Sequence, residues 1–398
     1  MPPSESCYAV FAEKLTNLNI LRVTVGSPEP VTAAAFTLQQ NRLVCDQDTI
    51  LDLSLYHLAS QGSCHARPHE TKTPDEPEQM TWDIKIPLQP TPAVPMPDDP
   101  AWWSAKDLLT NGWTDIACRH CQNVLVHNEA FTCKDMPSEH WFELVECWIC
   151  HEAKPEEHRR HLKPILARPG STLVGSFYFF LDAHNLQPKA VVPDQELLNK
   201  VNWDRGTLTK WISINCGHCG KVMGDGQFER QDGCERVMAV KLFKYCVQIL
   251  PKNEQLTRPE FINMLVGDMM EAAKAHATRK FLIQGRKTSK IYALIWLFNW
   301  DTTIVHNDGF KDDHLESDTT HRFHELHGLK ILYADGDVLG KQWAQDRTAD
   351  HLIYPDTYCH QLMQQLQASS ALLPPALRKL HHPALSLSKD FHVGFLPR

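Results

Sequence analysis

The chain has 398 residues, a length sufficient for two or three domains. Hydrophobic residues make up 42% of it and charged residues 22%, a balance typical of globular proteins that bury a sizeable core. The net charge of −8 argues against broad electrostatic binding to nucleic acid or to anionic membranes. No secretory signal pattern opens the sequence, and the most apolar run, 291–298, is shorter than the roughly 20 residues of a membrane span. We therefore expect a soluble protein of the cytoplasm and nucleus that makes no direct contact with nucleic acid or membrane.

Close spacing of short β-rich segments characterises residues 1–66, which we predict to be an N-terminal β domain. Its layout favours a small antiparallel sandwich or open barrel. The predicted strands are 7–15, 18–25, 33–38, 42–45 and 49–55. Residues 67–100 are rich in proline and are predicted to be a linker or loop with one edge strand at 82–86, because proline cannot donate to a strand ladder.

The remainder of the chain is predicted to form a zinc-binding region, 101–250, and a C-terminal α+β region, 251–398. The first contains a long strand over 237–249, rich in β-branched and aromatic residues. In the second, a helix is expected to begin near Thr257, followed by further strands and a final helix. The expected elements there are a hairpin of 281–284 with 291–299, a surface loop over 306–327, a strand at 329–333, a helix at 356–368 and a strand at 391–396. The predicted fold class is α+β.

Six of the 13 cysteines form three CxxC pairs, at 118/121, 147/150 and 216/219. In a chain without an export signal this spacing favours a metal site over disulfides. A redox CxxC would need a thioredoxin-like βαβ setting, which the sequence pattern lacks.

Two of these pairs share the pattern C-x-H-C-x-x-V followed by an apolar residue, one beginning at Cys118 and the other at Cys216. Each matches a zinc knuckle, in which a tight turn offers two thiolates. Together, Cys118, Cys121, Cys216 and Cys219 would supply a closed tetrahedral zinc site. The long intervening segment is no obstacle, because loop-closure entropy grows only logarithmically with length. Buried unliganded cysteines, or pairing of 118/121 with 147/150, are the alternatives, and His120 and His218 are expected to face solvent.

The third pair, Cys147 and Cys150, is followed by a charged, proline-containing stretch rather than by a strand. Two interpretations compete. In one, His158 and His161 join the pair in a second structural zinc site. In the other, Cys150-His151 is a free tip that meets a metal ion on a partner. Histidines 321, 324 and 327 also have metal-like spacing, but their Asp-rich setting favours a solvated segment.

Several ordered motifs give the sequence a family resemblance over residues 110–398. They are Met136-Pro-Ser-Glu-His-Trp141, Cys150-His151, Gly175-Ser-Phe-Tyr-Phe-Phe180, the knuckle after Cys216, Phe281-x-Ile-Gln-Gly285, Ile291-Tyr-Ala-Leu-Ile-Trp-Leu297, Leu373-Pro-Pro-Ala-Leu-Arg378 and Val393-Gly-Phe-Leu396. This order resembles the HECT-like ubiquitin-conjugating-enzyme-binding family, whose members are described as ubiquitin-protein ligases.

The resemblance implies two partners and a HECT-like character for 251–398. A ubiquitin-conjugating enzyme would contact the segment after the second knuckle, at Val237, Val240, Leu242 and Phe243. The second partner is the metallo-β-lactamase-type endonuclease of pre-mRNA 3′-end processing, whose zinc active site the loop Cys150-His151 would plug. Trp141, Cys147 and Trp148 would help to anchor that loop. The chemistry is reasonable, since a hydrolytic zinc keeps an open position that a thiolate can occupy.

A thioester-forming ligase also needs an accessible, activated cysteine, and the last third of the chain offers only Cys359. Cys359, Leu362, Met363 and Leu366 fall at helical spacing on one apolar face, which favours a buried small hydrophobe. Two functions therefore stand: a binding protein that masks the endonuclease, and a ubiquitin ligase that uses Cys359 or acts as a scaffold.

Overall fold

The structure is a computed structural model that describes residues 8–27, 29–69, 80–90, 102–128, 131–137, 166–205, 208–253, 256–311, 323–336, 348–380 and 391–398. The chain forms two compact units, one of Met1–Asp98 with Thr278–Arg398 and the other of Asp99–Ala277. The domain boundaries predicted from the sequence, at residues 66, 100 and 250, divide the chain into consecutive segments. The first unit instead joins both ends of the chain, because strand β1 (Ala9–Leu15) pairs with strand β20 (Ile291–His306).

A ten-stranded sheet dominates the first unit, in the order β23-β24-β21-β20-β1-β2-β8-β7, with β19 beside β20 and β22 beside β19. Its strands are β1 (Ala9–Leu15), β2 (Ile20–Ser27), β7 (His65–His69), β8 (Met80–Pro87), β19 (Lys280–Gly285), β20 (Ile291–His306), β21 (His324–Asp335), β22 (Ala349–Tyr354), β23 (Lys379–Leu380) and β24 (Phe391–Pro397). A second sheet, ordered β5-β4-β3-β6, consists of β3 (Phe36–Gln39), β4 (Arg42–Cys45), β5 (Asp48–Asp52) and β6 (Gly62–Ser63).

Strand β1 is buried on both faces, which explains its nearly continuous apolar sequence. Val10 and Ala12 join a core that includes Phe36 and Leu43 of the second sheet. Ala9 and Phe11, on the other face, join a core with residues near the C-terminus. The two sheets therefore share a core in this part of the chain, and the larger sheet continues into the C-terminal strands, beyond the N-terminal domain that the sequence predicts.

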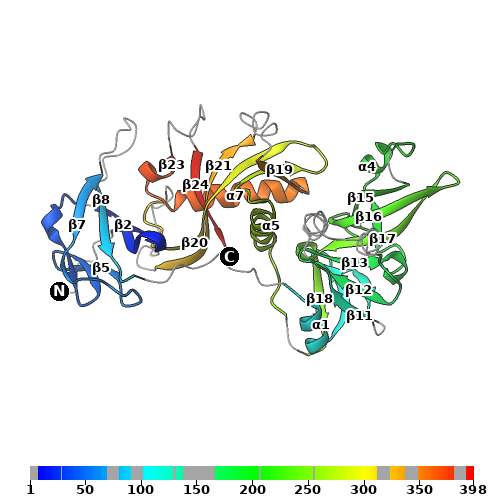
Figure 1. Cartoon of the computed structure of the whole chain (residues 1–398), viewed down its shortest axis with the longest axis horizontal. Coiled ribbons are helices and arrows are strands. Elements are labelled where there is room, and N and C mark those ends of the chain that lie inside the picture. The colour runs from blue at the N-terminus through cyan, green and yellow to red at the C-terminus, as the bar shows by residue number, and fades with distance from the viewer. Residues whose placement is uncertain are drawn as a thin grey trace, which may run out of the picture. The chain divides into compact units, whose positions relative to one another are not determined.

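Helix α7 (Asp356–Ala371) packs against β19, β20 and β24 of the large sheet (Figure 1). Cys359, Leu362 and Leu366 are fully buried, so the helical spacing correctly predicted this element and its apolar face. The predicted hairpin is also confirmed, as β19 and β20 pair in antiparallel fashion.

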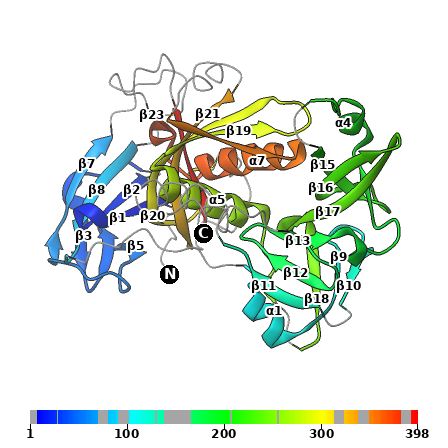
Figure 2. The same ribbon diagram turned by 45° about the vertical axis from the view of Figure 1, so that its right-hand side comes forward.

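The second unit contains a seven-stranded sheet ordered β11-β12-β13-β17-β16-β15-β14 and a three-stranded sheet ordered β10-β9-β18. Figure 2 shows β15, β16 and β17 side by side. The strands are β9 (Trp113–Cys118), β10 (Val124–His127), β11 (Thr132–Asp135), β12 (Ser171–Val174), β13 (Tyr178–Asp182), β14 (Val191–Pro193), β15 (Thr209–Cys216), β16 (Val222–Gln231), β17 (Cys234–Phe243) and β18 (Val247–Pro251). Among the described residues of this unit, the α-helices are α1 (Ala105–Asn111), α4 (Gln195–Asn199) and α5 (Phe261–His276). Short 3-10 turns of this unit are Ala183–Asn185 and Lys244–Cys246, and those of the first unit are Thr16–Leu18, Ala33–Ala35 and Pro375–Leu377.

The prediction of one strand over 237–249 is wrong, because the chain changes sheets inside it. Strand β17 ends at Phe243, a 3-10 turn follows, and β18 then pairs with β9 in the other sheet. Lys244 fixes the turn: its side chain is fully buried and donates a hydrogen bond to the Trp102 carbonyl. A buried ammonium group needs such a partner, so its presence inside an apolar run marks the break.

Two further boundaries differ from expectation. Helix α5 begins at Phe261 rather than near Thr257, because Glu260 is the N-cap and forms a capping box with Asn263. The predicted loop over 306–327 is wrong for its last residues, since β21 starts at His324 and pairs with β20. Among the helices that the structure describes, none is long and apolar enough to cross a membrane.

Candidate metal centre

Two matching turns place the four knuckle cysteines. Cys118 is the last residue of β9 and Cys216 the last residue of β15. At each turn the N–H of the first cysteine donates to the carbonyl five residues later, over 2.8 Å at Cys118 and 2.7 Å at Cys216. Each cysteine carbonyl then accepts from the N–H four residues later, that of Gln122 or Gly220, over 2.9 Å. Both of these residues have positive φ, 62° and 71°, the left-handed turn that lets the chain leave as a new strand.

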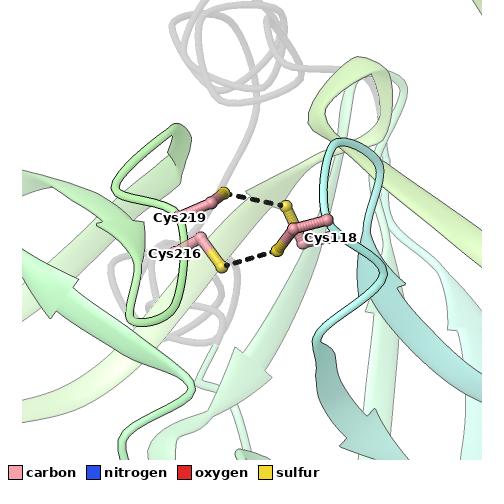
Figure 3. Close-up of side chains that lie close together, drawn as sticks. Cys118, Cys216 and Cys219 are labelled. Atoms are coloured by element: carbon pink, nitrogen blue, oxygen red, sulfur yellow. Dashed lines mark hydrogen bonds between the residues drawn. The ribbon is translucent and has the colours of Figure 1, made fainter.

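The four sulfur atoms converge between the two turns, as Figure 3 shows for Cys118, Cys216 and Cys219. Cys118 Sγ lies 3.7 Å from Cys219 Sγ, and Cys121 Sγ lies 3.7 Å from Cys216 Sγ. All four atoms lie within 4.8 Å of one another. A tetrahedral ion with metal–sulfur bonds of about 2.3 Å would hold its sulfurs about 3.8 Å apart. The cluster therefore has the dimensions of a closed four-sulfur metal site.

The electrostatics of the cluster favour a cation. Burial raises the pKa of the Cys118 thiol and of the Cys121 thiol above the usual value. Burial also opposes ionisation of Cys216, but backbone hydrogen bonds from Cys219 and His218, with neighbouring thiols, outweigh it and lower its pKa. Thiolates this close repel one another, so several can coexist only around a positive ion.

Two residues that the sequence analysis did not single out support the cluster. Asn123 Nδ2 donates to Cys216 Sγ over 3.8 Å, so it links one turn to a sulfur of the other. Arg119, within the first turn, donates from Nη1 to the carbonyls of Tyr245 and Pro259, each over 3.2 Å. Its Nη2 forms an ion pair with Glu260, the N-cap of α5. Both side chains lie between or beside knuckle cysteines in the sequence, but nothing local indicates their distant partners.

The other residues that the sequence singled out near the cysteines are two knuckle histidines and the third CxxC pair. His120 and His218 are exposed and are not part of the four-residue cluster. The cluster joins 118/121 to 216/219, as the matching motifs predict. Trp141, Cys147, Trp148, Cys150 and His151 lie outside the described residues, as do His158 and His161 of the alternative second site.

Comparison with known proteins places the chain in a family. A family model described as HECT-like ubiquitin-conjugating enzyme (E2)-binding matches residues 13–383, which include the four cysteines and helix α7. The chain belongs to this family. Similar proteins named as E3 ubiquitin-protein ligases occur in Bos taurus (23% identity, 70% of this chain and 71% of the relative) and Homo sapiens (22% identity, 70% and 71%). An uncharacterized protein of Saccharomyces cerevisiae is 21% identical over 70% of each chain. No solved structure matches.

In this HECT-like family member, Cys359 is not exposed at all. Its Sγ lies 3.7 Å from the carbonyl oxygens of Gln284 and Tyr354, which accept from the thiol. Burial, and to a smaller degree the nearby Asp356 carboxylate, raises the pKa of Cys359 to about 12. These surroundings stabilise the neutral thiol.

The predicted contact segment for the conjugating enzyme lies in β17. Val240, Leu242 and Phe243 are buried and Val237 is half-buried, so these side chains pack inside the unit. Contact through these residues stays a prediction. A surface contact by β17 would use its exposed first residues, 234–236, and Met238.

The metal-like histidines do not converge among the residues that the structure describes. His324 and His327 are exposed on β21, where His327 Nδ1 pairs with Thr303 Oγ1 at 2.9 Å and His324 stacks on His306. His321 lies outside the described residues.

Proposed function

We propose that this protein binds a ubiquitin-conjugating enzyme and supports ubiquitin ligation as a non-covalent scaffold. The family match supports the partner, and the name of the mammalian relatives supports the pathway. Burial of Cys359 is the observation that favours a non-covalent scaffold over a ligase that forms a thioester with ubiquitin. A buried thiol whose pKa is raised to about 12 is almost entirely neutral at pH 7, and only the thiolate attacks a thioester.

We further propose that the four-cysteine cluster holds zinc. Four thiolates at tetrahedral spacing suit zinc or an iron–sulfur centre, and closed four-sulfur sites of the CxxC type are characteristic of structural zinc. The site offers no open coordination position, so its role is to hold β9 and β15 together rather than to catalyse.

A discharge assay tests the scaffold proposal. A conjugating enzyme charged with ubiquitin is incubated with the wild-type protein or with Cys359→Ala, and loss of the thioester is followed on non-reducing gels. We expect equal discharge by both proteins, because the buried thiol takes no part. A reducible ubiquitin adduct on the wild-type protein that is absent from a folded Cys359→Ala variant would refute the scaffold. Absence of any binding to a panel of conjugating enzymes would refute the proposed partner.

A second candidate function rests on the cysteines that the cluster leaves over. Four sulfurs complete the closed site without Cys147 or Cys150. We propose that Cys150-His151 occupies the zinc site of the 3′-end processing endonuclease, with Trp141, Cys147 and Trp148 holding the loop, in cytoplasm and nucleus. Cys150→Ala should abolish binding to that endonuclease at unchanged zinc content. Loss of one zinc ion from the variant would instead make Cys150 a structural ligand and end the masking proposal.

A further inference from the structure

A cavity of about 300 Å³ opens on the large sheet of the first unit. Its walls come from β1, β2, β20, β21, β23 and β24 together with the 3-10 turn Pro375–Leu377. Apolar side chains make up much of the lining, chiefly Phe11, Phe298, Leu332, Leu377 and Val393. The family motif Leu373-Pro-Pro-Ala-Leu-Arg378 therefore forms one wall, a role that the metal site and the buried Cys359 do not account for.

A buried ion pair forms part of this lining. Lys330 Nζ donates to both carboxylate oxygens of Glu13, over 2.8 and 2.7 Å, and the two side chains are only 18% and 8% exposed. The same ammonium group lies 5.8 Å from the centre of the Phe298 ring and 6.0 Å from that of Phe395. Because removing charges from water is costly, the pair is stable only with such close geometry. The pair is neutral as a whole and adds no net charge to the cavity lining.

The two other charged side chains of the lining, Arg22 and Lys379, differ in whether a carboxylate neutralises them. Arg22 is neutralised by Asp83 through two hydrogen bonds of 2.8 and 3.0 Å. Lys379 also lines the cavity, is exposed, and has no carboxylate within salt-bridge distance in the part of the chain that the structure describes. The lining thus carries one surplus positive charge beside apolar walls. Phe298 lies at the same cavity and is 53% exposed, which is high for a large apolar side chain.

We propose that this cavity binds a small amphipathic carboxylic acid, with its apolar body against Phe298, Leu377 and Val393 and its carboxylate at Lys379. The volume is about twice the ~150 Å³ that accepts benzene in an engineered cavity, and it lies at the lower end of natural ligand sites. One aromatic ring or a medium-length alkyl chain with a short carboxylate arm fits that space. This ligand site is separate from the metal centre and goes beyond the proposed scaffold function.

4-Phenylbutyrate, with about a dozen non-hydrogen atoms, is a suitable probe, and its amide is the matched uncharged control. At the ligand efficiency of small molecules, we expect the full-length zinc-loaded protein to bind the acid with a dissociation constant of about 0.1–1 mM, measured by calorimetry or NMR. Lys379→Gln should weaken binding of the acid about fivefold and leave the weak binding of the amide unchanged.

Ala376→Phe provides an independent test, because Ala376 lines the cavity but is exposed, so a larger side chain fills the space without disturbing the core. This variant should lose binding at an unchanged melting temperature. Lys134→Gln, an exposed lysine of the other unit, is the control and should bind like wild type. No binding below about 5 mM, equal affinity for acid and amide, or unchanged binding by either cavity variant would overturn the proposal. A peptide ending in phenylalanine that binds at least tenfold more tightly than the acid would overturn it too, since it would assign the cavity to polypeptide C-termini.

Discussion

If the four-cysteine cluster holds a metal ion, as we propose, removal of that ion should unfold one compact unit and spare the other. All four cysteines of the cluster belong to the unit Asp99–Ala277. Each CxxC turn can still offer two thiolates to a metal when the chain is unfolded. Binding by all four sulfurs then requires closure of a long loop, because Cys121 and Cys216 are 95 positions apart. The folded unit has already brought the two turns together.

The size of the effect follows from that separation. Closing a loop of about 100 residues costs roughly 4–5 kcal/mol on the chain-entropy scale, so the metal favours the folded unit by at least that amount. The upper bound is the full binding free energy of a structural zinc, on the order of 10 kcal/mol. Domain stabilities are about 5–15 kcal/mol, and the metal-free unit should therefore be largely unfolded at 37 °C.

Hydrogen exchange with mass spectrometry resolves the two units. After chelation, or in Cys121→Ser, peptides from β9, β15 and β16 should lose protection while peptides from β20 and β21 keep it. Cys234→Ser, an exposed cysteine of the same unit outside the cluster, is the control and should behave like wild type. Unchanged exchange after complete metal loss, or equal loss of protection in both units, would refute the reasoning.

Three further predictions concern single residues. Arg119→Ala should lower the free energy of unfolding of the metal-loaded protein by about 1–2 kcal/mol in urea titrations, with partial recovery in Arg119→Lys, because it removes two hydrogen bonds and an ion pair to the N-cap of α5. Gly224→Ala should cost at least ~3 kcal/mol or prevent folding, since its new Cβ would lie 1.8 Å from the Lys241 carbonyl oxygen; Gly233→Ala, with positive φ but open space, should cost only about 1–2 kcal/mol. Burial alone would raise the pKa of Asp356, but hydrogen bonds to its carboxylate lower it below the usual value. The stability that Asp356 contributes is therefore present above about pH 4 and lost as the pH falls through its folded-state pKa, so the penalty of Asp356→Asn should shrink from pH 6 toward pH 3; a penalty independent of pH would contradict this assignment.

Much of the four-cysteine cluster could be predicted from local sequence patterns. A tight turn with two cysteines is specified within about six residues, by spacing and by a residue that tolerates positive φ, so each knuckle is visible in the sequence. The match between the two motifs also predicted which pairs meet. The partners of Arg119 and Asn123 were not predictable, since the type of a side chain does not specify which distant carbonyl or sulfur atom will accept its hydrogen bond.

The sequence by itself determined the elements whose pattern is periodic and local, among them the β19–β20 hairpin, helix α7 with the buried Cys359, and the two cysteine turns. Only the tertiary structure decided the rest. It showed that β1 joins β20, that the apolar run after residue 237 is divided between two sheets at Lys244, and that Glu13 and Lys330 meet beside a cavity. The physical reason is that helical and turn geometry is set by neighbours in the chain, whereas strand pairing and buried charge pairing depend on residues hundreds of positions apart, which the local sequence does not encode.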